Sequence, residues 1–348
     1  MKVMHILNTG GVSGAENVAI SIINKMKKDY DIESYYVALE GDIRDILYDN
    51  KIPYIALPKL SPKILKDVIK NVSPDIIHAH DYTASINAAL SMDDIPIISH
   101  IHNNKPWIKK INVNSIAYGI STLRYKKIVT VSDSIKNEYI FGRLIKSRTI
   151  CLGNPMDMSN IRRKASEYEC KNCFDLVYVG RLTEAKNPEL LLNIVKSLIN
   201  RSPDVRVAIV GEGDQYVDFK EKISELPKNA VKMYGFIQNP YPIMAKSKVL
   251  CLPSKWEGFG LAAAEALALG IPVVCSGAGG LKNIVNDECG AICGEESKKY
   301  IIEIEHLLTD PEYYHKKKEA ALRRSLEIEN MEKYSRELYE IYNSILNK

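Results

Sequence analysis

The sequence predicts an α/β fold built from two Rossmann-like domains, and three features carry this prediction. The chain has 348 residues, which is long for a single hydrophobic core and suits two. Apolar runs with strand character alternate with helical patterns, as expected for parallel sheets covered by helices. Residues 2–7 and 174–180 each form an apolar run that leads through a glycine-containing turn into a helix, so both halves open alike.

In the first half, the strand patterns lie at 2–7, 34–39, 52–57, 74–80, 96–102, 127–132 and 149–152. Helical patterns separate them, with the clearest at 42–49, 62–71 and 133–141. The turn after the first strand contains Gly10, Gly11 and Gly14. It could bind phosphate at the start of the next helix, although it lacks the full spacing of a dinucleotide-binding fingerprint.

In the second half, we expect strands at 174–180, 205–210, 231–234 and 249–252. Asn187 followed by Pro188 predicts the start of a helix, because Asn caps helices and Pro suits the first helical position. An Ala/Leu-rich helix is expected at 261–269, followed by helices at 300–308, 315–326 and 331–346.

Composition indicates an ordinary globular protein. Hydrophobic residues make up 46% and charged residues 26%, and no apolar run approaches the length that a bilayer crossing needs. The first strand begins at once, without the pattern of a secretory signal, so we expect a cytoplasmic protein that could associate peripherally with the membrane. The seven cysteines are expected as reduced thiols. We expect no metal site, since Cys170, Cys173, Cys289 and Cys293 lack the paired spacing of zinc ligands.

Positive charge is concentrated in the first half. Residues 1–153 carry 20 Lys/Arg against 15 Asp/Glu, while the remainder carries 27 against 28. The stretch 105–127 has no acidic residue, and its cations alternate with Trp107, Ile108 and Ile111. Such a stretch could contact an anionic membrane surface or a pyrophosphate-linked acceptor, and the alternative is an ordinary solvated face. The modest surplus of charge argues against nucleic acid as a partner.

Two histidines stand out in the fourth strand pattern. His78 and His80 are two positions apart, so on a strand they point to the same side, as metal ligands would. No third ligand is evident in the sequence. We therefore expect them to lie at a strand end, at the rim of a cleft.

The most informative stretch spans residues 251–275. Glu257 and Glu265 lie eight positions apart across a turn that contains Gly258 and Gly260 and leads into the Ala/Leu-rich helix. The unpaired amides at the start of a helix suit a phosphate, whereas carboxylates accept hydrogen bonds from hydroxyl groups. Amides for phosphate and carboxylates for hydroxyls together indicate a sugar nucleotide.

This stretch resembles the E-x7-E signature of the retaining glycosyltransferases of family four, which have the GT-B fold of two Rossmann-like domains facing across a cleft. In that family the first Glu contacts the transferred sugar, the second contacts the ribose, and amides of the turn contact the sugar and diphosphate. By position, these roles fall on Glu257 and Glu265. The amides are those of Phe259, Gly260, Leu261 and Ala262.

The resemblance extends to other motifs. Arg181 and Lys186 match the pair that stabilises the leaving nucleotide, and His102 matches a histidine that contacts the transferred sugar near the reaction centre. Gly211 and Phe236 fall where relatives contact the nucleobase and ribose, and the turn of Gly10, Gly11 and Gly14 falls where they face donor and acceptor. One departure is Asn283, where many relatives have Glu, and another is Pro155, where Gly is usual.

The resemblance implies a hexosyltransferase that uses a nucleotide-sugar donor, with a UDP-sugar expected, and requires no metal or other cofactor. Its acceptor would be a glycan or a polyprenyl-diphosphate-linked glycan, in capsule, exopolysaccharide or cell-envelope synthesis. We expect an acceptor domain at 1–157, a donor domain at 158–325, and a helix at 326–348 that returns to the first domain. The alternatives are a catalytically silent sugar-nucleotide-binding or membrane-binding protein, a nucleotide-sugar epimerase and, with less support, an NAD-dependent oxidoreductase.

Overall fold

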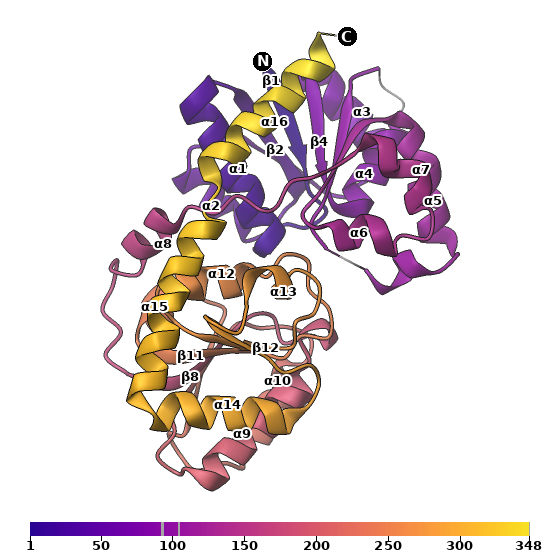
Figure 1. Cartoon of the computed structure of the whole chain (residues 1–348). Helices are drawn as coiled ribbons and strands as arrows, with labels where there is room; N and C mark the ends of the chain where they lie inside the picture. The colour runs from indigo at the N-terminus through magenta and orange to yellow at the C-terminus, as the bar shows by residue number, and fades with distance from the viewer. Residues whose placement is uncertain (92–93, 104, 348) are drawn as a thin grey trace. The chain divides into compact units, whose positions relative to one another are not determined.

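The computed structural model describes residues 1–91, 94–103 and 105–347 (Figure 1). The chain divides into two compact units. The first combines residues 1–155 with residues 330–348, and the second contains residues 156–329. The division falls two residues before the boundary expected from the sequence.

The first unit is built on a parallel sheet in the order β3-β2-β1-β4-β5-β6-β7. Its strands are β1 (Lys2–Ile6), β2 (Glu33–Leu39), β3 (Tyr54–Leu57), β4 (Ile76–His80), β5 (Ile97–Ile101), β6 (Tyr125–Thr130) and β7 (Thr149–Cys151). Strands β4 and β5 are buried along their whole length, as expected for inner strands of a sheet with both faces covered. Register pairs His5 with His78 and His80 with His100.

Helices connect these strands and cover the sheet (Figure 1). They are α1 (Gly14–Tyr30), α2 (Ile43–Asp49), α3 (Pro62–Val72), α4 (Asp81–Leu90), α5 (Val113–Ser121), α6 (Asp133–Glu138) and α7 (Gly142–Ile145). Short 3-10 turns lie at Pro106–Lys109 (η1), Thr122–Arg124 (η2) and Lys146–Arg148 (η3). Local sequence explains several starts: the Ser61 side chain caps α3, and Asn112 and Ser115 form a capping box at α5.

The last helix, α16 (Met331–Leu346), belongs to the first unit, as the predicted fold class requires. Its Tyr339 stacks on Tyr30 of α1 with ring centroids 3.9 Å apart. Its Tyr342 hydroxyl lies 2.7 Å from His78 Nδ1 of β4. The Ser335 hydroxyl donates to Asp29 at 3.1 Å, so three turns of the helix are tied to this unit.

The second unit has a parallel sheet in the order β10-β9-β8-β11-β12-β13. Its strands are β8 (Phe174–Val179), β9 (Val207–Val210), β10 (Val231–Gly235), β11 (Ser247–Leu252), β12 (Val273–Cys275) and β13 (Gly290–Ile292). Its helices are α8 (Met158–Lys164), α9 (Pro188–Arg201), α10 (Tyr216–Ser224), α11 (Tyr241–Ala245), α12 (Leu261–Ala268), α13 (Leu281–Ile284), α14 (Ser297–Thr309) and α15 (Pro311–Ile328). A 3-10 turn, η4 (Glu184–Lys186), precedes α9.

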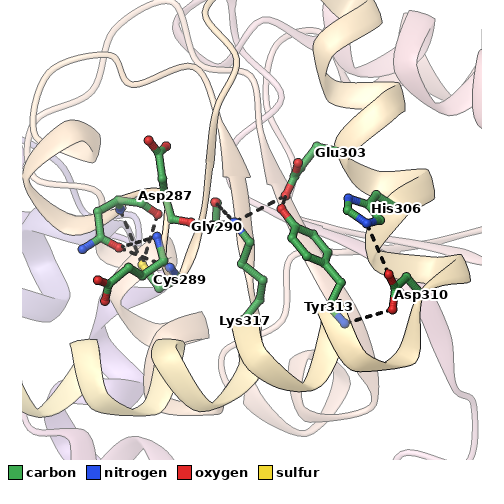
Figure 2. Close-up of polar contacts among 10 residues, drawn as sticks. Asp287, Cys289, Gly290, Glu303, His306, Asp310, Tyr313 and Lys317 are labelled. Atoms are coloured by element: carbon green, nitrogen blue, oxygen red, sulfur yellow. Dashed lines mark hydrogen bonds and ion pairs between the residues drawn. The ribbon is translucent and has the colours of Figure 1, made fainter.

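A buried lysine joins three elements of this unit (Figure 2). The ammonium of Lys317 on α15 donates to the carbonyls of Asp287 and Gly290, at 2.6 and 2.8 Å, where β13 begins. It also lies 3.7 Å from the Glu303 carboxylate of α14 and 4.9 Å from the centroid of the Tyr313 ring. The charge is therefore surrounded by acceptors although the side chain is buried.

The observed elements differ from the predicted ones at two places in the first unit. The helix predicted at 133–141 ends at Glu138, and Tyr139 is extended, because its ring packs against Tyr118 of α5 and its hydroxyl donates to the Ser115 carbonyl. Most of α5 was not predicted from the sequence, because the apolar residues of this helix are not spaced along its buried side.

The cysteines are free thiols, and Cys251, Cys275, Cys289 and Cys293 are buried. None of the helices in the described part of the chain combines the length and the apolar composition that a bilayer crossing needs.

Candidate functional site

The predicted donor residues gather at one edge of the sheet in the second unit. The strand order reverses direction between β8 and β11, so the loops that follow these two strands diverge at a topological switch point. In open parallel sheets, ligands bind beyond the carboxyl ends of the strands at such a point. Arg181 and Lys186 lie in the loop after β8, and Glu257 lies in the loop after β11.

These two loops are joined by an ion pair between Lys186 Nζ and Glu257 Oε2, and both side chains are largely buried. The Ser254 hydroxyl lies 3.4 Å from the same carboxylate oxygen. The backbone reinforces the contact, since the amide of Lys255 donates to the Ala185 carbonyl at 2.9 Å. The predicted Lys186 and Glu257 are thus brought together.

Arg181 follows the end of β8 and its side chain is exposed. Its backbone carbonyl accepts a hydrogen bond of 2.9 Å from the hydroxyl of Tyr178. Burial, and then the nearby Glu257 carboxylate, raise the pKa of Tyr178 well above its usual value. Tyr178 was not predicted as a site residue, because in the sequence it is one more apolar position of a strand.

The start of α12 has the features expected of an anion site. Gly260 precedes the helix with a φ of 99°, a conformation that a side chain would strain. Its carbonyl accepts from the amides of Ala263 and Ala264, whereas the amides of Leu261 and Ala262 lie in the first turn, where a helix has no acceptor of its own. Phe259 is partly buried in the same turn.

A second glycine turn supports this loop from the side of β12. The amide of Gly280 donates to the Gly258 carbonyl at 2.9 Å. A Cβ atom at Gly279 would lie 1.8 Å from the carbonyl oxygen of Glu257, and one at Gly280 would lie 2.4 Å from that of Phe259. These glycines are therefore needed for the close approach of the two backbones. The nearby departure from the family pattern, Asn283, is exposed.

Glu265 lies on α12, where it accepts a hydrogen bond of 3.1 Å from the hydroxyl of Tyr241 on α11. Burial raises the pKa of Glu265 to about 7, although the Tyr241 hydrogen bond acts in the opposite direction. This carboxyl group therefore changes charge near neutral pH. Tyr241 could not be found from the sequence, since nothing in its surroundings marks it as a partner of Glu265.

Gly211 and Phe236 lie at the same edge of the sheet. Gly211 follows β9 with a φ of 126°, and a Cβ atom there would lie 2.1 Å from the Gly180 carbonyl oxygen. Its amide donates to the carbonyl of Gly235 at 2.7 Å, which links the loops after β9 and β10. Phe236, immediately after β10, is 49% exposed and offers an apolar ring at this edge.

In the first unit, the glycine turn lies between β1 and α1, beside the point where the strand order reverses between β1 and β4. Gly10 is buried, and a Cβ atom there would lie 2.4 Å from the carbonyl oxygens of Leu39 and Glu40, so its small size is required for packing. Gly11 is exposed, and Gly14 begins α1. The turn is held by Glu16, whose carboxylate accepts from the Ser13 hydroxyl.

His102 belongs to a cluster of five buried imidazoles, together with His5, His78, His80 and His100. Burial lowers the pKa of every one, to about 3 for His5, so all five rings are neutral at physiological pH. His80 is the last residue of β4, as the predicted strand end requires, whereas His78 lies within the strand; both are buried, so the prediction that they lie at a cleft rim is wrong.

The cluster contains two groups of three histidines whose spacing resembles that of metal ligands. Ligand atoms of His5, His78 and His80 lie within 4.8 Å of one another, as do those of His80, His100 and His102. The sequence offered no third ligand, because the additional histidines lie on other strands. Ring nitrogens of these histidines are hydrogen-bonded to one another in pairs, at 2.9–3.1 Å. The nitrogens in these pairs therefore already have a partner within the cluster.

The second unit thus holds an ammonium, a guanidinium, free helix amides and two carboxylates at one edge of a Rossmann-like sheet. The cationic groups and amides can bind a diphosphate, and the carboxylates can accept from sugar hydroxyls. Together with a second Rossmann-like unit, this defines the class of nucleotide-sugar-dependent transferases.

Comparison with known proteins gives the family. Residues 158–324 match the family described as glycosyl transferases group 1, and residues 12–159 match glycosyltransferase family 4. The chain is therefore a glycosyltransferase that carries a group 1 domain in its second half, and its fold is of the GT-B type.

Three relatives illustrate the similarity. An uncharacterized glycosyltransferase of Haemophilus influenzae is 25% identical over 339 residues, which cover 89% of this chain and 90% of the relative. An uncharacterized 41.2 kDa protein in the cps region of Klebsiella pneumoniae is 25% identical over 354 residues, and the match covers 92% of this chain and 93% of the relative. The crystal structure of Anabaena Alr3699/HepE in complex with UDP-glucose has a TM-score of 0.84 at 21% identity, over 99% of this chain and 100% of that protein.

Proposed function

We propose that this glycosyltransferase transfers a hexose from a UDP-hexose to a glycan or a polyprenyl-diphosphate-linked glycan, with retention of the anomeric configuration. The observation that carries the proposal is the Lys186–Glu257 pair beside the first turn of α12, at the switch point of the sheet. Two findings about similar proteins support it: one structural neighbour is a complex with UDP-glucose, and one relative is a protein in the cps region of Klebsiella pneumoniae.

In this proposal, the diphosphate binds to the amides of Leu261 and Ala262 and to the cations that follow β8. The bond between the anomeric carbon and the β-phosphate oxygen breaks, and negative charge develops on the leaving UDP. Lys186 and Arg181 stabilise that charge, which is the largest catalytic contribution we assign to this chain. The requirement is electrostatic, so we propose that no metal ion is needed.

In this proposal, the two carboxylates contact different parts of the donor. Glu257 accepts from hydroxyls of the transferred sugar, and Glu265 accepts from the ribose, beside the exposed ring of Phe236 for the base. The acceptor hydroxyl attacks the anomeric carbon on the same face of the sugar from which UDP leaves, and the proton of this hydroxyl passes to a β-phosphate oxygen. The new glycosidic bond therefore keeps the original anomeric configuration.

The first unit is proposed to bind the acceptor. His102 is assigned to contact the transferred sugar, and the exposed Gly11 lies in the turn after β1. A catalytically silent sugar-nucleotide-binding protein would bind UDP without turnover, and an epimerase would act on the donor with no acceptor present.

One experiment separates these possibilities. The purified chain is screened by thermal shift against UDP-, GDP- and ADP-hexoses, because a ligand that binds the native state raises its melting temperature. UDP release is then measured with and without lipid-linked glycan acceptors. We expect stabilisation by a UDP-hexose and acceptor-dependent UDP release, with an α-linked product from an α-linked donor. Stabilisation by GDP- or ADP-hexoses alone, or an inverted product, would contradict the proposal.

A further inference from the structure

The outer side of α5 is apolar although it is exposed. Val113, Ile116 and Ile120 follow the spacing of one helical face, and Leu123 continues it after the helix. Their exposed fractions are 82%, 43%, 64% and 74%. The opposite side of α5 packs on the unit through residues such as Tyr118. The buried residues of this helix are Ser115, Tyr118 and Ser121, so its larger aliphatic side chains lie on the outer side.

Neighbouring residues extend the apolar surface. Ile111 precedes α5 and is 69% exposed. Ile140 is exposed as well, and its amide donates to the Ile108 carbonyl of η1 at 2.9 Å, which holds it beside the start of α5. We define the α5 face as Ile111, Val113, Ile116, Ile120, Leu123 and Ile140. Helix α5 lies at the rim of the first unit (Figure 1).

The chain segment that contains the α5 face is rich in cations. Residues 105–148 contain ten Lys/Arg and two Asp/Glu, so this segment alone has a larger positive surplus than the whole chain, whose net charge is +4. Lys105, Lys109, Lys110, Arg124 and Lys126 are exposed. One of them, Lys109, pairs with Glu138 at 3.3 Å.

We propose that the α5 face docks on an anionic lipid bilayer. Its isoleucine, valine and leucine side chains would enter the boundary between headgroups and acyl chains, and the Lys and Arg of the same segment would contact anionic headgroups. Exposed aliphatic residues and exposed cations in one segment match this partner on both counts. A second copy of the chain matches less well, because two such faces would repel each other.

Sedimentation of the full chain with vesicles tests the proposal. Vesicles of phosphatidylcholine alone are compared with vesicles that also contain phosphatidylglycerol. We expect binding only to the second kind, and weaker binding as salt is raised, because salt screens the charge contribution. Replacing Ile120 and Leu123 together by Asp, or Lys110, Arg124 and Lys126 together by Gln, is expected to lower the bound fraction about tenfold or more.

A matched control comes from the second unit. Ile302 on α14 is 64% exposed, the same fraction as Ile120, but lies outside the cationic segment. Ile302→Asp should leave vesicle binding unchanged, and melting temperatures verify that all variants fold. Wild-type binding that does not depend on phosphatidylglycerol, or an equal loss in Ile302→Asp, would overturn the proposal. So would a concentration-dependent dimer that the Ile120 and Leu123 changes abolish in the absence of vesicle binding.

The histidine cluster carries a second, independent inference. His5 Nδ1 lies 3.1 Å from His80 Nε2, and His80 Nδ1 lies 2.9 Å from His102 Nε2. Each neutral ring has one N–H and one acceptor nitrogen. Since each contact needs one donor and one acceptor, the three rings must all carry hydrogen on Nε2 or all carry it on Nδ1. The tautomer of one ring therefore fixes that of the others.

The hydrogen-bonded line of His5, His80 and His102 reaches, at His102, the edge of the sheet where ligands are expected to bind. His102 comes directly after β5, at the carboxyl edge of the sheet, and its amide donates to Asp81 Oδ1 at 3.0 Å. Asp81 has a φ of 65°, a strained conformation for a residue with a side chain. The opposite end of the line, His5, lies within β1 in the buried interior.

We infer that His5 and His80 are positioning residues, which set the tautomer and orientation of His102 through this hydrogen-bonded line. The inference rests on the proposed function for the part His102 plays beside the transferred sugar. The hydrogen bonds themselves do not depend on that function. The two can therefore be tested apart.

Two substitutions at His80 separate its two hydrogen bonds. His80→Asn places an amide near the former Nδ1 and retains the contact to His102, whereas His80→Gln places it near the former Nε2 and retains only the contact to His5. Ring 15N chemical shifts report the tautomer of His102 without any substrate. We expect one tautomer in the wild type and averaged shifts in both variants, because His80→Gln loses the contact to His102 and His80→Asn loses the contact to His5.

Activity gives the second measurement. We expect kcat to fall about tenfold or more in His80→Gln and less than that in His80→Asn, with an unchanged KM for the donor and similar melting temperatures. A mixture of tautomers for His102 in the wild-type protein would overturn the inference without any variant. Unchanged His102 shifts in His80→Gln would overturn it too. If the wild type shows no UDP release, the proposed function fails, while the chemical shifts still decide the inference.

Discussion

At the scale of single residues, the site depends on two opposite charges, Lys186 in the loop after β8 and Glu257 in the loop after β11. Lys186 and Glu257 neutralise each other in the free protein, and both are largely shielded from water. Removing one partner of such a pair leaves the other charge without compensation. Loss of the lysine would therefore do more than remove a cation, because a carboxylate would remain facing an incoming diphosphate.

We accordingly predict that Lys186→Ala lowers kcat for UDP release about 10²–10³-fold, a loss typical for removing one group that stabilises the leaving charge. Lys196→Ala is the matched control. Lys196 also pairs with a glutamate, Glu225, at 2.9 Å, but it lies on α9 and its side chain is 33% exposed. Steady-state kinetics of both variants check the prediction, and equal effects on kcat would show that the position of Lys186 has no special role.

Glu265 makes stability depend on pH. Burial raises its pKa in the folded protein to about 7, from the ordinary value of 4.5. The unfolded chain therefore binds fewer protons than the folded one between these values, and the free energy of unfolding should fall as pH rises through this window. The loss is at most about 3 kcal/mol and is complete above the folded pKa.

Glu265→Gln should remove this dependence, because the amide does not titrate. Melting temperatures of the wild type and the variant, compared at roughly pH 5 and roughly pH 8, check the prediction. Glu184→Gln, a change of an exposed carboxylate in the same unit, should keep the wild-type slope. An unchanged slope in Glu265→Gln would mean that this carboxyl group titrates near its ordinary value.

Single residues also show where prediction from sequence ends. The spacing of Glu257 and Glu265 was sufficient to place one in a loop and one on a helix. The spacing of His78 and His80 gave their common side but missed three further imidazoles, since His5 and His100 reach them only through strand pairing. Contacts across strands depend on register, which a single sequence does not contain.

At the scale of elements, helices were predicted where the sequence carries their caps. Asn187 and Pro188 start α9 as expected, because the Asn side chain accepts from the Leu190 amide. The short strand β13 was not predicted, as its three residues carry no periodic signal. The α5 region was misread for another reason. Its aliphatic residues are exposed and its buried residues are Ser115, Tyr118 and Ser121, which is the reverse of the usual pattern of a half-buried helix.

Lys317 shows how one residue can join elements that local sequence does not connect (Figure 2). We predict that Lys317→Ala destabilises the second unit by about 2–4 kcal/mol, because two carbonyls and the Glu303 carboxylate lose a buried donor. The melting temperature should fall by several degrees. Lys318→Ala, at the exposed position next to it, should have little effect. Similar losses in the two variants would contradict the role of the buried ammonium.

At the scale of the whole molecule, the two units differ in how the chain forms them. The second is one continuous segment, 156–329, whereas the first combines 1–155 with 330–348. The sequence indicated this return through its resemblance to the GT-B fold, and not through periodicity. Periodicity predicted a helix at 331–346 but could not say which sheet it would cover. Its partners are far earlier in the chain: Tyr30 precedes Tyr339 by 309 residues, and His78 precedes Tyr342 by 264.

This difference predicts that the two units respond in opposite ways to being expressed alone. The fragment 156–329 contains every strand of its sheet and the residues from Arg181 to Glu265, so it should fold and be stabilised by UDP in a thermal-shift assay. The fragment 1–155 lacks α16. It would expose the surface that buries Leu338, Ile341 and Ile345, each worth about 1.5–3 kcal/mol, in a domain whose stability is about 5–15 kcal/mol.

We therefore expect 1–155 to melt at a much lower temperature than the same fragment joined by a flexible linker to 330–348, in which α16 can pack again. Tyr342→Phe within the joined protein should cause only a small loss, since it removes the contact to His78 and keeps the ring. Amide hydrogen exchange locates the effect: without α16, protection should be lost first in α1 and β4, which contact Tyr339 and Tyr342. If 1–155 alone melts as high as the joined protein, the first unit folds without its last helix, and the return of the chain has no part in its stability.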